Sequence, residues 1–134
     1  MSKSKTPYLI DFHQIGDDSI GHISVAEMEN DVPFVIKRVF WTYGTPETVE
    51  RGNHAHKTNE EIIVPVAGKI TITTESVNGE NETFVLDNPN RGLYIPTNVW
   101  IKMSYIPGTV QLVINSSLFK EEEYIRSYED FKAL

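Results

Sequence analysis

The sequence predicts an all-β fold, a sandwich or barrel of short strands that ends in one short helix. Turn signals recur at intervals of roughly 8–12 residues, which is typical of such folds. Between the turns, apolar and polar residues alternate, as they do in strands with one buried face. Helical spacing of apolar residues occurs only in the tail of the sequence.

The first half of the sequence contains five expected strands, at residues 8–10, 21–25, 34–43, 53–57 and 61–66. The segment 34–43 is rich in β-branched and aromatic residues and is bounded by Pro33 and Gly44. A turn is expected at residues 16–19. Pro65 lies inside a strand pattern, which predicts an edge strand or a bulge there.

The second half continues with strands at residues 69–74, 83–86, 92–95, 100–105 and 109–115. Asn78-Gly79 is a strong signal for a tight hairpin turn. Residues 120–134 place Tyr124, Ile125, Tyr128 and Phe131 at helical spacing, so we expect one amphipathic helix there. The acidic run at 121–123 is then a solvated first helical turn.

Length and composition narrow the class of protein. A chain of 134 residues is long enough for one domain with a real core, which we expect to span residues 1–134. The net charge of −7 argues against a nucleic-acid partner. No segment is apolar enough for a signal peptide or a membrane span. With no cysteine, the sequence fits a cytoplasmic protein.

His54 and His56 are the most informative residues. Side chains two apart in a strand point to the same face, so the two imidazoles can converge on one small volume. Two neutral imidazoles can hold a metal ion, or they can move protons near neutral pH. Arg51 and Lys57 bracket the pair and provide local positive charge for an anion.

The pattern His54-x-His56-x₄-Glu61-x₆-Gly68 is similar to the first sequence motif of the cupin superfamily, whose members are small jelly-roll barrels. Two imidazoles and a carboxylate can bind a divalent metal. The second cupin motif normally supplies another histidine, but Ile101 takes that position here. The remaining histidines lie in the N-terminal region without a partner at ligand spacing and are expected to be structural.

A longer resemblance covers nearly the whole sequence. The matching segments include 36–39, 44–45, 51–57 and 92–95, then Trp100-x-x-Met103 and the tail 124–131. In these segments the chain resembles the nucleotide-sugar 3,4-ketoisomerases, small cupins that act on thymidine-diphosphate (TDP)-linked 4-keto-6-deoxyhexoses. The tail separates this family from other cupin barrels.

The resemblance implies a homodimeric isomerase that needs no metal and no cofactor. It implies that His54 and His56 transfer a proton from C3 to C4 of the sugar through an enediol, in deoxysugar biosynthesis. Arg51 would contact the diphosphate of the TDP-linked substrate. Asn53, Glu61 and Trp100 are the further substrate-binding candidates; Trp100 has the alternative role of filling the barrel.

Four of the positions at which the chain departs from the family pattern bear on its function. Ile20 stands where Arg or Tyr is usual, Glu61 where Gln is usual, and Ile101 and Lys102 where His or Arg and then Glu are usual. These changes bear on which sugar is accepted. They also keep two other functions open. One is a non-catalytic cupin that binds a nucleotide sugar, and the other is a metal-dependent enzyme that uses His54, His56 and Glu61.

Overall fold

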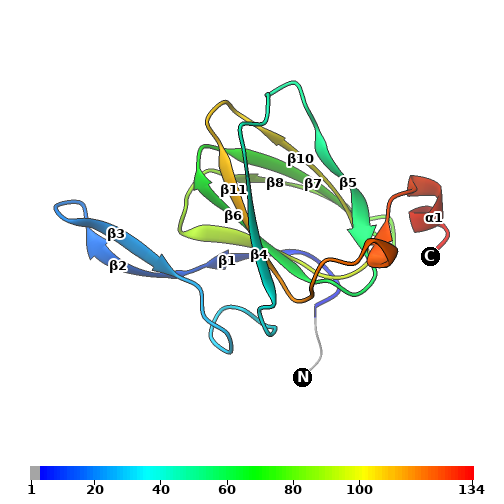
Figure 1. Cartoon of the computed structure of the whole chain (residues 1–134), viewed down its shortest axis with the longest axis horizontal. Coiled ribbons are helices and arrows are strands. Elements are labelled where there is room, and N and C mark those ends of the chain that lie inside the picture. The colour runs from blue at the N-terminus through cyan, green and yellow to red at the C-terminus, as the bar shows by residue number, and fades with distance from the viewer. Residues whose placement is uncertain (1–3) are drawn as a thin grey trace.

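Two five-stranded antiparallel sheets face each other in the computed structural model, which describes residues 4–134 (Figure 1). The first sheet has the order β1 (Tyr8–Asp11), β9 (Arg91–Ile95), β6 (Glu61–Ala67), β11 (Val110–Asn115) and β4 (Arg38–Tyr43). The second has the order β12 (Tyr124–Ile125), β5 (Arg51–His56), β10 (Val99–Tyr105), β7 (Ile70–Ser76) and β8 (Asn81–Leu86). This arrangement is a jelly roll, so the predicted fold class is confirmed.

The core between the sheets follows from the alternation in the strands. Ile63, Ile72 and Ile101 are among eleven buried residues, from both sheets, that pack into one cluster. Their neighbours in sequence point the other way; some, such as Ile62 and Trp100, are buried, whereas Thr73 and Lys102 are exposed. On the outer face of the second sheet, Trp100 packs with Phe131 of helix α1 (Tyr128–Lys132). Both faces of that sheet are therefore buried at this end.

The N-terminal region differs from the prediction in two places. Residues 34–37 are not in a strand, because Phe34 instead packs into a second cluster on the outer side of the first sheet. The expected turn at 16–19 is the tip of a hairpin of β2 (His13–Asp17) and β3 (Gly21–Val25). This hairpin belongs to neither sheet and projects away from both (Figure 1).

Pro65 lies in β6, between its two neighbours in the first sheet, at a break in the pairing with β11. Gln111 is opposite Pro65, whereas the preceding residue of β11, Val110, is opposite Ala67. The extra residue in β6 is Val66, so the bulge predicted from the proline is confirmed.

The single helix expected at residues 120–134 is wrong for most of that segment. Only Tyr128–Lys132 is α-helical, after a 3₁₀ turn at Glu121–Glu123. Between them lies β12, in which Tyr124 is opposite His56 and Ile125 is opposite Ala55. Backbone pairing with the edge of β5 thus replaces the first turns of the expected helix. None of the helices in residues 4–134 is long and apolar enough to cross a membrane.

Candidate active site

Strand β5 carries a bulge that positions the candidate residues. Ile101 of β10 is opposite His54, but the next residue of β10 is opposite Gly52, so Asn53 is the extra residue. Gly52 has φ 89° and Asn53 has φ 57°, and a Cβ on Gly52 would approach the Ile101 carbonyl oxygen to 2.8 Å. A glycine is therefore required. Because of this bulge, Arg51 and His54 face the same side of the sheet although they are three residues apart.

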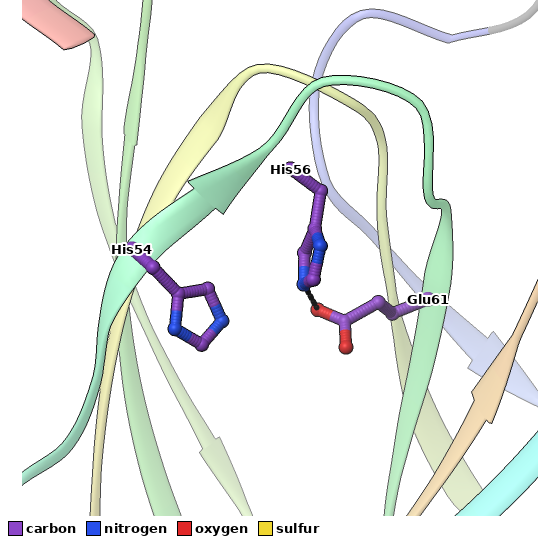
Figure 2. Close-up of side chains that lie close together, drawn as sticks. All are labelled: His54, His56 and Glu61. Atoms are coloured by element: carbon purple, nitrogen blue, oxygen red, sulfur yellow. Dashed lines mark ion pairs between the residues drawn. The ribbon is translucent and has the colours of Figure 1, made fainter. Parts of the chain in front are cut away.

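His54 and His56 point into the space between the sheets, where Glu61 meets them from the start of β6 (Figure 2). The two imidazole centroids are 5.0 Å apart, with an interplanar angle of 75°. Nε2 of His56 lies 3.5 Å from Oε1 of Glu61, and both side chains are almost fully buried. The contact is an ion pair that is too long for a good hydrogen bond.

The other ring nitrogen of each histidine has a defined partner. Nδ1 of His54 is 3.1 Å from the carbonyl oxygen of Gly52, so Nδ1 carries the proton that it donates. Nδ1 of His56 is 2.5 Å from a carboxylate oxygen of Glu123. The other Glu123 oxygen accepts hydrogen bonds from the backbone N–H groups of Thr58 and Asn59, at 3.3 Å each. These contacts fix both rings and direct both Nε2 atoms to the same space.

The two histidines differ in charge. Burial is the largest influence on His54 and lowers its pKa below the ordinary value of 6.5, so the ring is neutral at pH 7. Burial also disfavours a charged His56, but the carboxylates of Glu61 and Glu123 outweigh it and raise the pKa of His56. Burial likewise favours a neutral Glu61, yet the facing imidazoles outweigh it and lower the pKa of that carboxyl group. The two adjacent imidazoles are therefore biased in opposite directions, His54 towards the neutral form and His56 towards the protonated form.

These side chains line a cavity of about 220 Å³ between the sheets. One wall is apolar and consists of Ile63, Ile101, Met103 and Val113. The remaining lining includes hydrogen-bonding and charged groups: Arg51, His54, His56, Glu61, Gln111, Tyr124 and Arg126. A cavity lined by an apolar wall, two arginines and two imidazoles suits an anionic ligand. The uncharged, polar part of such a ligand can then react beside the imidazoles.

Comparisons with known proteins show the family of the chain. Residues 5–134 match the FdtA family, described as WxcM-like, C-terminal. A TDP-4-oxo-6-deoxy-α-D-glucose-3,4-oxoisomerase from Aneurinibacillus thermoaerophilus is 35% identical over 116 residues, which are 86% of this chain and 83% of the relative. The chain belongs to the FdtA family. The predicted resemblance to the sugar 3,4-ketoisomerases is thereby confirmed.

Two solved structures extend the comparison to the fold. The TDP-quinovose 3,4-ketoisomerase WlaRB from Campylobacter jejuni is 31% identical with a TM-score of 0.91, covering 98% of this chain and 100% of that one. A histidine-to-asparagine variant of the 3,4-ketoisomerase QdtA from Thermoanaerobacterium thermosaccharolyticum, in complex with TDP-4-keto-6-deoxyglucose, is 31% identical with a TM-score of 0.91. The match covers 98% of this chain and 94% of that one. The jelly roll of this FdtA-family chain is thus the one seen in sugar 3,4-ketoisomerases.

Four of the six predicted site residues of this FdtA-family chain lie together in the cavity: Arg51, His54, His56 and Glu61. Asn53 and Trp100 lie on the opposite face of the same sheet, in a second cavity of about 240 Å³ beside Tyr128 of α1. The Trp100 ring contacts the rings of Tyr128 and Phe131, with centroids 5.4 and 5.7 Å away. The structure therefore does not bring these two residues to the histidine pair.

The positions at which the sequence departs from the family pattern are also separated. Ile101 lines the cavity beside His54, where a further histidine ligand would have projected. Lys102 lines the second cavity on the outer face. Ile20 lies at the turn of the projecting hairpin and is 81% exposed. Only Glu61 and Ile101 of this group change the surroundings of the two imidazoles.

Sequence reasoning missed three residues of the tail: Glu123, Tyr124 and Arg126. Glu123 was expected in a solvated helical turn, but it is 6% exposed and contacts His56. The Tyr124 ring lies 4.5 Å from the His56 ring, and the Arg126 guanidinium lies 4.2 Å above Tyr124. The tail motif indicated the family, but no local signal indicated that β12 pairs with β5.

The cavity also contains one set of groups that could hold a metal ion. One ligand atom each from His54, His56 and Glu61 lie within 4.8 Å of one another. No other cluster of three or more such groups occurs in the part of the chain that the structure describes. Ile101 offers no fourth ligand, so any ion bound there would have a coordination position open to the cavity.

Proposed function

We propose that this protein is a sugar 3,4-ketoisomerase that interconverts a TDP-linked 4-keto-6-deoxyhexose and its 3-keto isomer. The observation that carries the proposal is two imidazoles in one cavity, where burial lowers the pKa of His54 and the carboxylates of Glu61 and Glu123 raise the pKa of His56. Such a pair provides a base and an acid near neutral pH. The names of the relatives, which are TDP-sugar 3,4-ketoisomerases, support the reaction and the substrate class.

The first half of the reaction forms an enediol. The C4 carbonyl makes the C3 proton acidic, and Nε2 of His54 accepts that proton. The C3–H electrons form a C3–C4 double bond, while the carbonyl electrons move to O4, which takes a proton from His56. Stabilising charge where it develops is the main source of such catalysis. The ring orientations set by Gly52 and Glu123 support this assignment of roles.

The second half runs in the opposite direction. The O3 hydroxyl returns a proton to His56 as the C3 carbonyl forms, and the double-bond electrons take the proton from His54 at C4. One C–H bond breaks at C3 and one forms at C4, so the sugar is isomerised without net oxidation. Both histidines recover their starting protonation states, and no cofactor is consumed.

Arg51 is the proposed contact for the diphosphate. It lines the cavity and is exposed, so a planar guanidinium with two parallel donors is available to an anion. Arg126 also lines the cavity, but it already donates to both carboxylate oxygens of Glu121, at 2.6 and 2.8 Å. Lys57 is exposed and donates to the Glu122 carbonyl oxygen at 3.3 Å, outside the cavity lining.

The proposal includes a homodimer, one domain over residues 1–134, and a role in deoxysugar biosynthesis in the cytoplasm. The projecting hairpin supports the dimer, because Ile15, Ile20 and Ile23 are 49%, 81% and 61% exposed there. Exposed apolar side chains on a hairpin outside both sheets are a typical surface for a second copy. Light scattering after size exclusion should give twice the chain mass of 15.3 kDa. A monomer at micromolar concentration would contradict the dimer.

The deciding experiment is incubation with TDP-4-keto-6-deoxyglucose in D₂O. Isomerisation exchanges the transferred hydrogen with solvent, so deuterium should enter the ring and a 3-keto sugar should appear. The rival function is a non-catalytic nucleotide-sugar-binding protein, which the apolar Ile101 beside His54 favours because it offers the sugar no hydrogen bond. Tight binding with an unchanged, undeuterated sugar would establish the rival instead.

A further inference from the structure

We propose that the Tyr124 hydroxyl donates a hydrogen bond to the sugar oxygen at which negative charge develops, and that Arg38 positions the hydroxyl for this contact. The inference deepens the proposed isomerase function and rests on it. It adds a third side chain to the pair of imidazoles. No proton leaves Tyr124, so the proton balance of the two half-reactions is unchanged.

Backbone pairing holds Tyr124 against both imidazoles. The residue lies in β12 directly opposite His56, and its side chain lines the cavity between the sheets. Its ring centroid is 4.5 Å from that of His56 and 5.2 Å from that of His54. A sugar bound between the two imidazoles would therefore lie beside the phenol.

The Tyr124 ring is also held from outside the histidine pair. The Phe119 ring contacts it with a centroid distance of 5.7 Å, and the Arg126 guanidinium lies 4.2 Å above it. Arg126 is in turn fixed by Glu121, at 2.6 and 2.8 Å. The ring is therefore held in place before the sugar binds. A donor that is preorganised in this way is effective at stabilising charge that develops in the reaction.

Arg38 interacts with the hydroxyl of the phenol. It lies in β4, in the sheet opposite β12, and its guanidinium lowers the pKa of Tyr124. Burial has the larger influence and raises that pKa above its ordinary value of 10, so the phenol keeps its proton at pH 7. A guanidinium only donates hydrogen bonds, so it can use only the phenol oxygen. The phenolic proton remains available to an acceptor in the cavity.

The surroundings of Arg38 keep its guanidinium beside the phenol. Nη2 donates to Oδ1 of Asn115 at 3.4 Å, and the guanidinium carbon lies 5.6 and 5.7 Å from the ring centroids of Phe40 and Phe119. Nε is buried without a hydrogen-bond partner within residues 4–134. A cation in such surroundings interacts more strongly with a neighbouring hydroxyl than it would in water. Arg38 is therefore assigned as a positioning residue that acts on the sugar through Tyr124.

The tail provides a matched control for Tyr124. Tyr128 lies on the outer face of the same sheet, and its hydroxyl already donates to Glu75 at 2.7 Å. Replacing either tyrosine with phenylalanine removes one oxygen and keeps the ring, so the packing changes little in both variants. Only the change at Tyr124 should affect turnover.

The kinetic test uses the full chain and the D₂O assay. Tyr124→Phe should lower kcat by about 10²–10³-fold, as expected for the loss of one donor to developing charge, and should change KM by less than about threefold. Tyr128→Phe should leave both constants unchanged. The two sides of the pH profile should keep their positions in Tyr124→Phe. A shift of the alkaline side would show that the hydroxyl acts on His56 instead of the sugar, and would overturn the inference.

The positioning role of Arg38 is tested by a double-mutant cycle. Arg38→Met should lower kcat by about tenfold, within the range of coupling between contacting residues, and Arg38→Lys should recover part of that loss. Arg38→Met combined with Tyr124→Phe should be no slower than Tyr124→Phe alone, because the two side chains act as a unit. Urea denaturation checks that each variant is folded. Fully additive losses would overturn the role of Arg38.

The outcomes separate this inference from the function on which it rests. If the wild-type protein exchanges deuterium and Tyr124→Phe stays within about threefold of its rate, the inference is overturned and the isomerase function stands. Equal losses in Tyr124→Phe and Tyr128→Phe would assign the effect to the tail as a whole and overturn it too. A wild-type protein that binds the sugar without any exchange would overturn the isomerase function and this inference with it.

Discussion

The two faces of the second sheet use the same strands for different purposes. On the inner face, β5 and β10 place Arg51, His54 and Ile101 around the cavity between the sheets. On the outer face, Asn53 and Trp100, which directly precede His54 and Ile101 in the sequence, line a second cavity of similar volume. Alternation along a strand puts the proposed reactive residues on one side and the residues that pack against the tail on the other.

The faces differ in whether their ionisable groups are already hydrogen-bonded, although Nε1 of Trp100 on the outer face also lacks a partner within the described residues. On the outer side, the Tyr128 hydroxyl donates to Glu75 at 2.7 Å, and Lys132 donates to the same carboxylate at 3.0 Å. On the inner side, Nε2 of His56 and Oε1 of Glu61 lack hydrogen bonds within the described residues. A pocket alone therefore does not indicate a reactive site. Buried ionisable groups with spare bonding capacity do.

Substitutions on the two faces should have very different effects on the rate. His54→Ala and His56→Ala should each lower the isomerisation rate by about two to four orders of magnitude, because each removes the proposed base or acid. Tyr128→Phe, which removes the hydroxyl that donates to Glu75 on the outer face, should stay close to the wild-type rate. Steady-state rates in the D₂O assay measure both. Near wild-type turnover in the two histidine variants would refute the mechanism.

A smaller loss is expected from the tail. Glu123→Gln keeps an oxygen for Nδ1 of His56 but removes the negative charge beside the ring. The protonated form of His56 is then less stable, so we expect the rate to fall by about one to two orders of magnitude at pH 7. Glu121→Gln, which alters the exposed ion pair with Arg126, is the control. Equal losses in both variants would show that general damage to the tail is the cause.

The pH dependence sharpens the assignment of acid and base. His54 must be neutral, so kcat/KM should fall as the pH drops through its pKa, which lies below 6.5. His56 must be protonated, so kcat/KM should fall as the pH rises through its pKa, which lies above 6.5. The profile is then bell-shaped, with about a tenfold loss per pH unit on each side. Glu123→Gln should move only the alkaline side, to lower pH; a shift of the acid side would reverse the two roles.

The smallest effect on chemistry is expected from the outer face. Phe131 is 1% exposed and packs on Trp100, so Phe131→Leu should lower the free energy of unfolding by about 1 kcal/mol. Urea denaturation measures that loss. The turnover number per folded molecule should be unchanged below the unfolding transition. A large fall in turnover at full stability would mean that the outer face takes part in the reaction.

Much of this site could be predicted from local sequence patterns. The alternation within β5 placed His54 and His56 on one face, and the resemblance placed Ile101 in the position of a missing ligand. The same alternation puts Trp100, one residue earlier, on the other face, as the structure shows. Its assignment to the substrate followed the family motif instead of this geometry.

The rest depends on contacts between distant parts of the chain. Tyr124, Ile125, Tyr128 and Phe131 fit a helix by their spacing, but they equally fit a short strand followed by one helical turn. The choice is decided by the exposed backbone edge of β5, nearly seventy residues earlier, where Tyr124 pairs with His56. No local pattern contains that information, so the burial of Glu123 could not be expected either.

The bulge in β5 has a consequence for chains that differ in length. The side on which Arg51 projects depends on the number of residues before His54, because Asn53 has no partner in β10. A deletion of Asn53 alone would restore a regular ladder and turn the guanidinium outward, with both imidazoles left in place. A homologue that aligns with a single gap at this position should therefore keep the histidine pair. It should lack the proposed contact between Arg51 and the diphosphate.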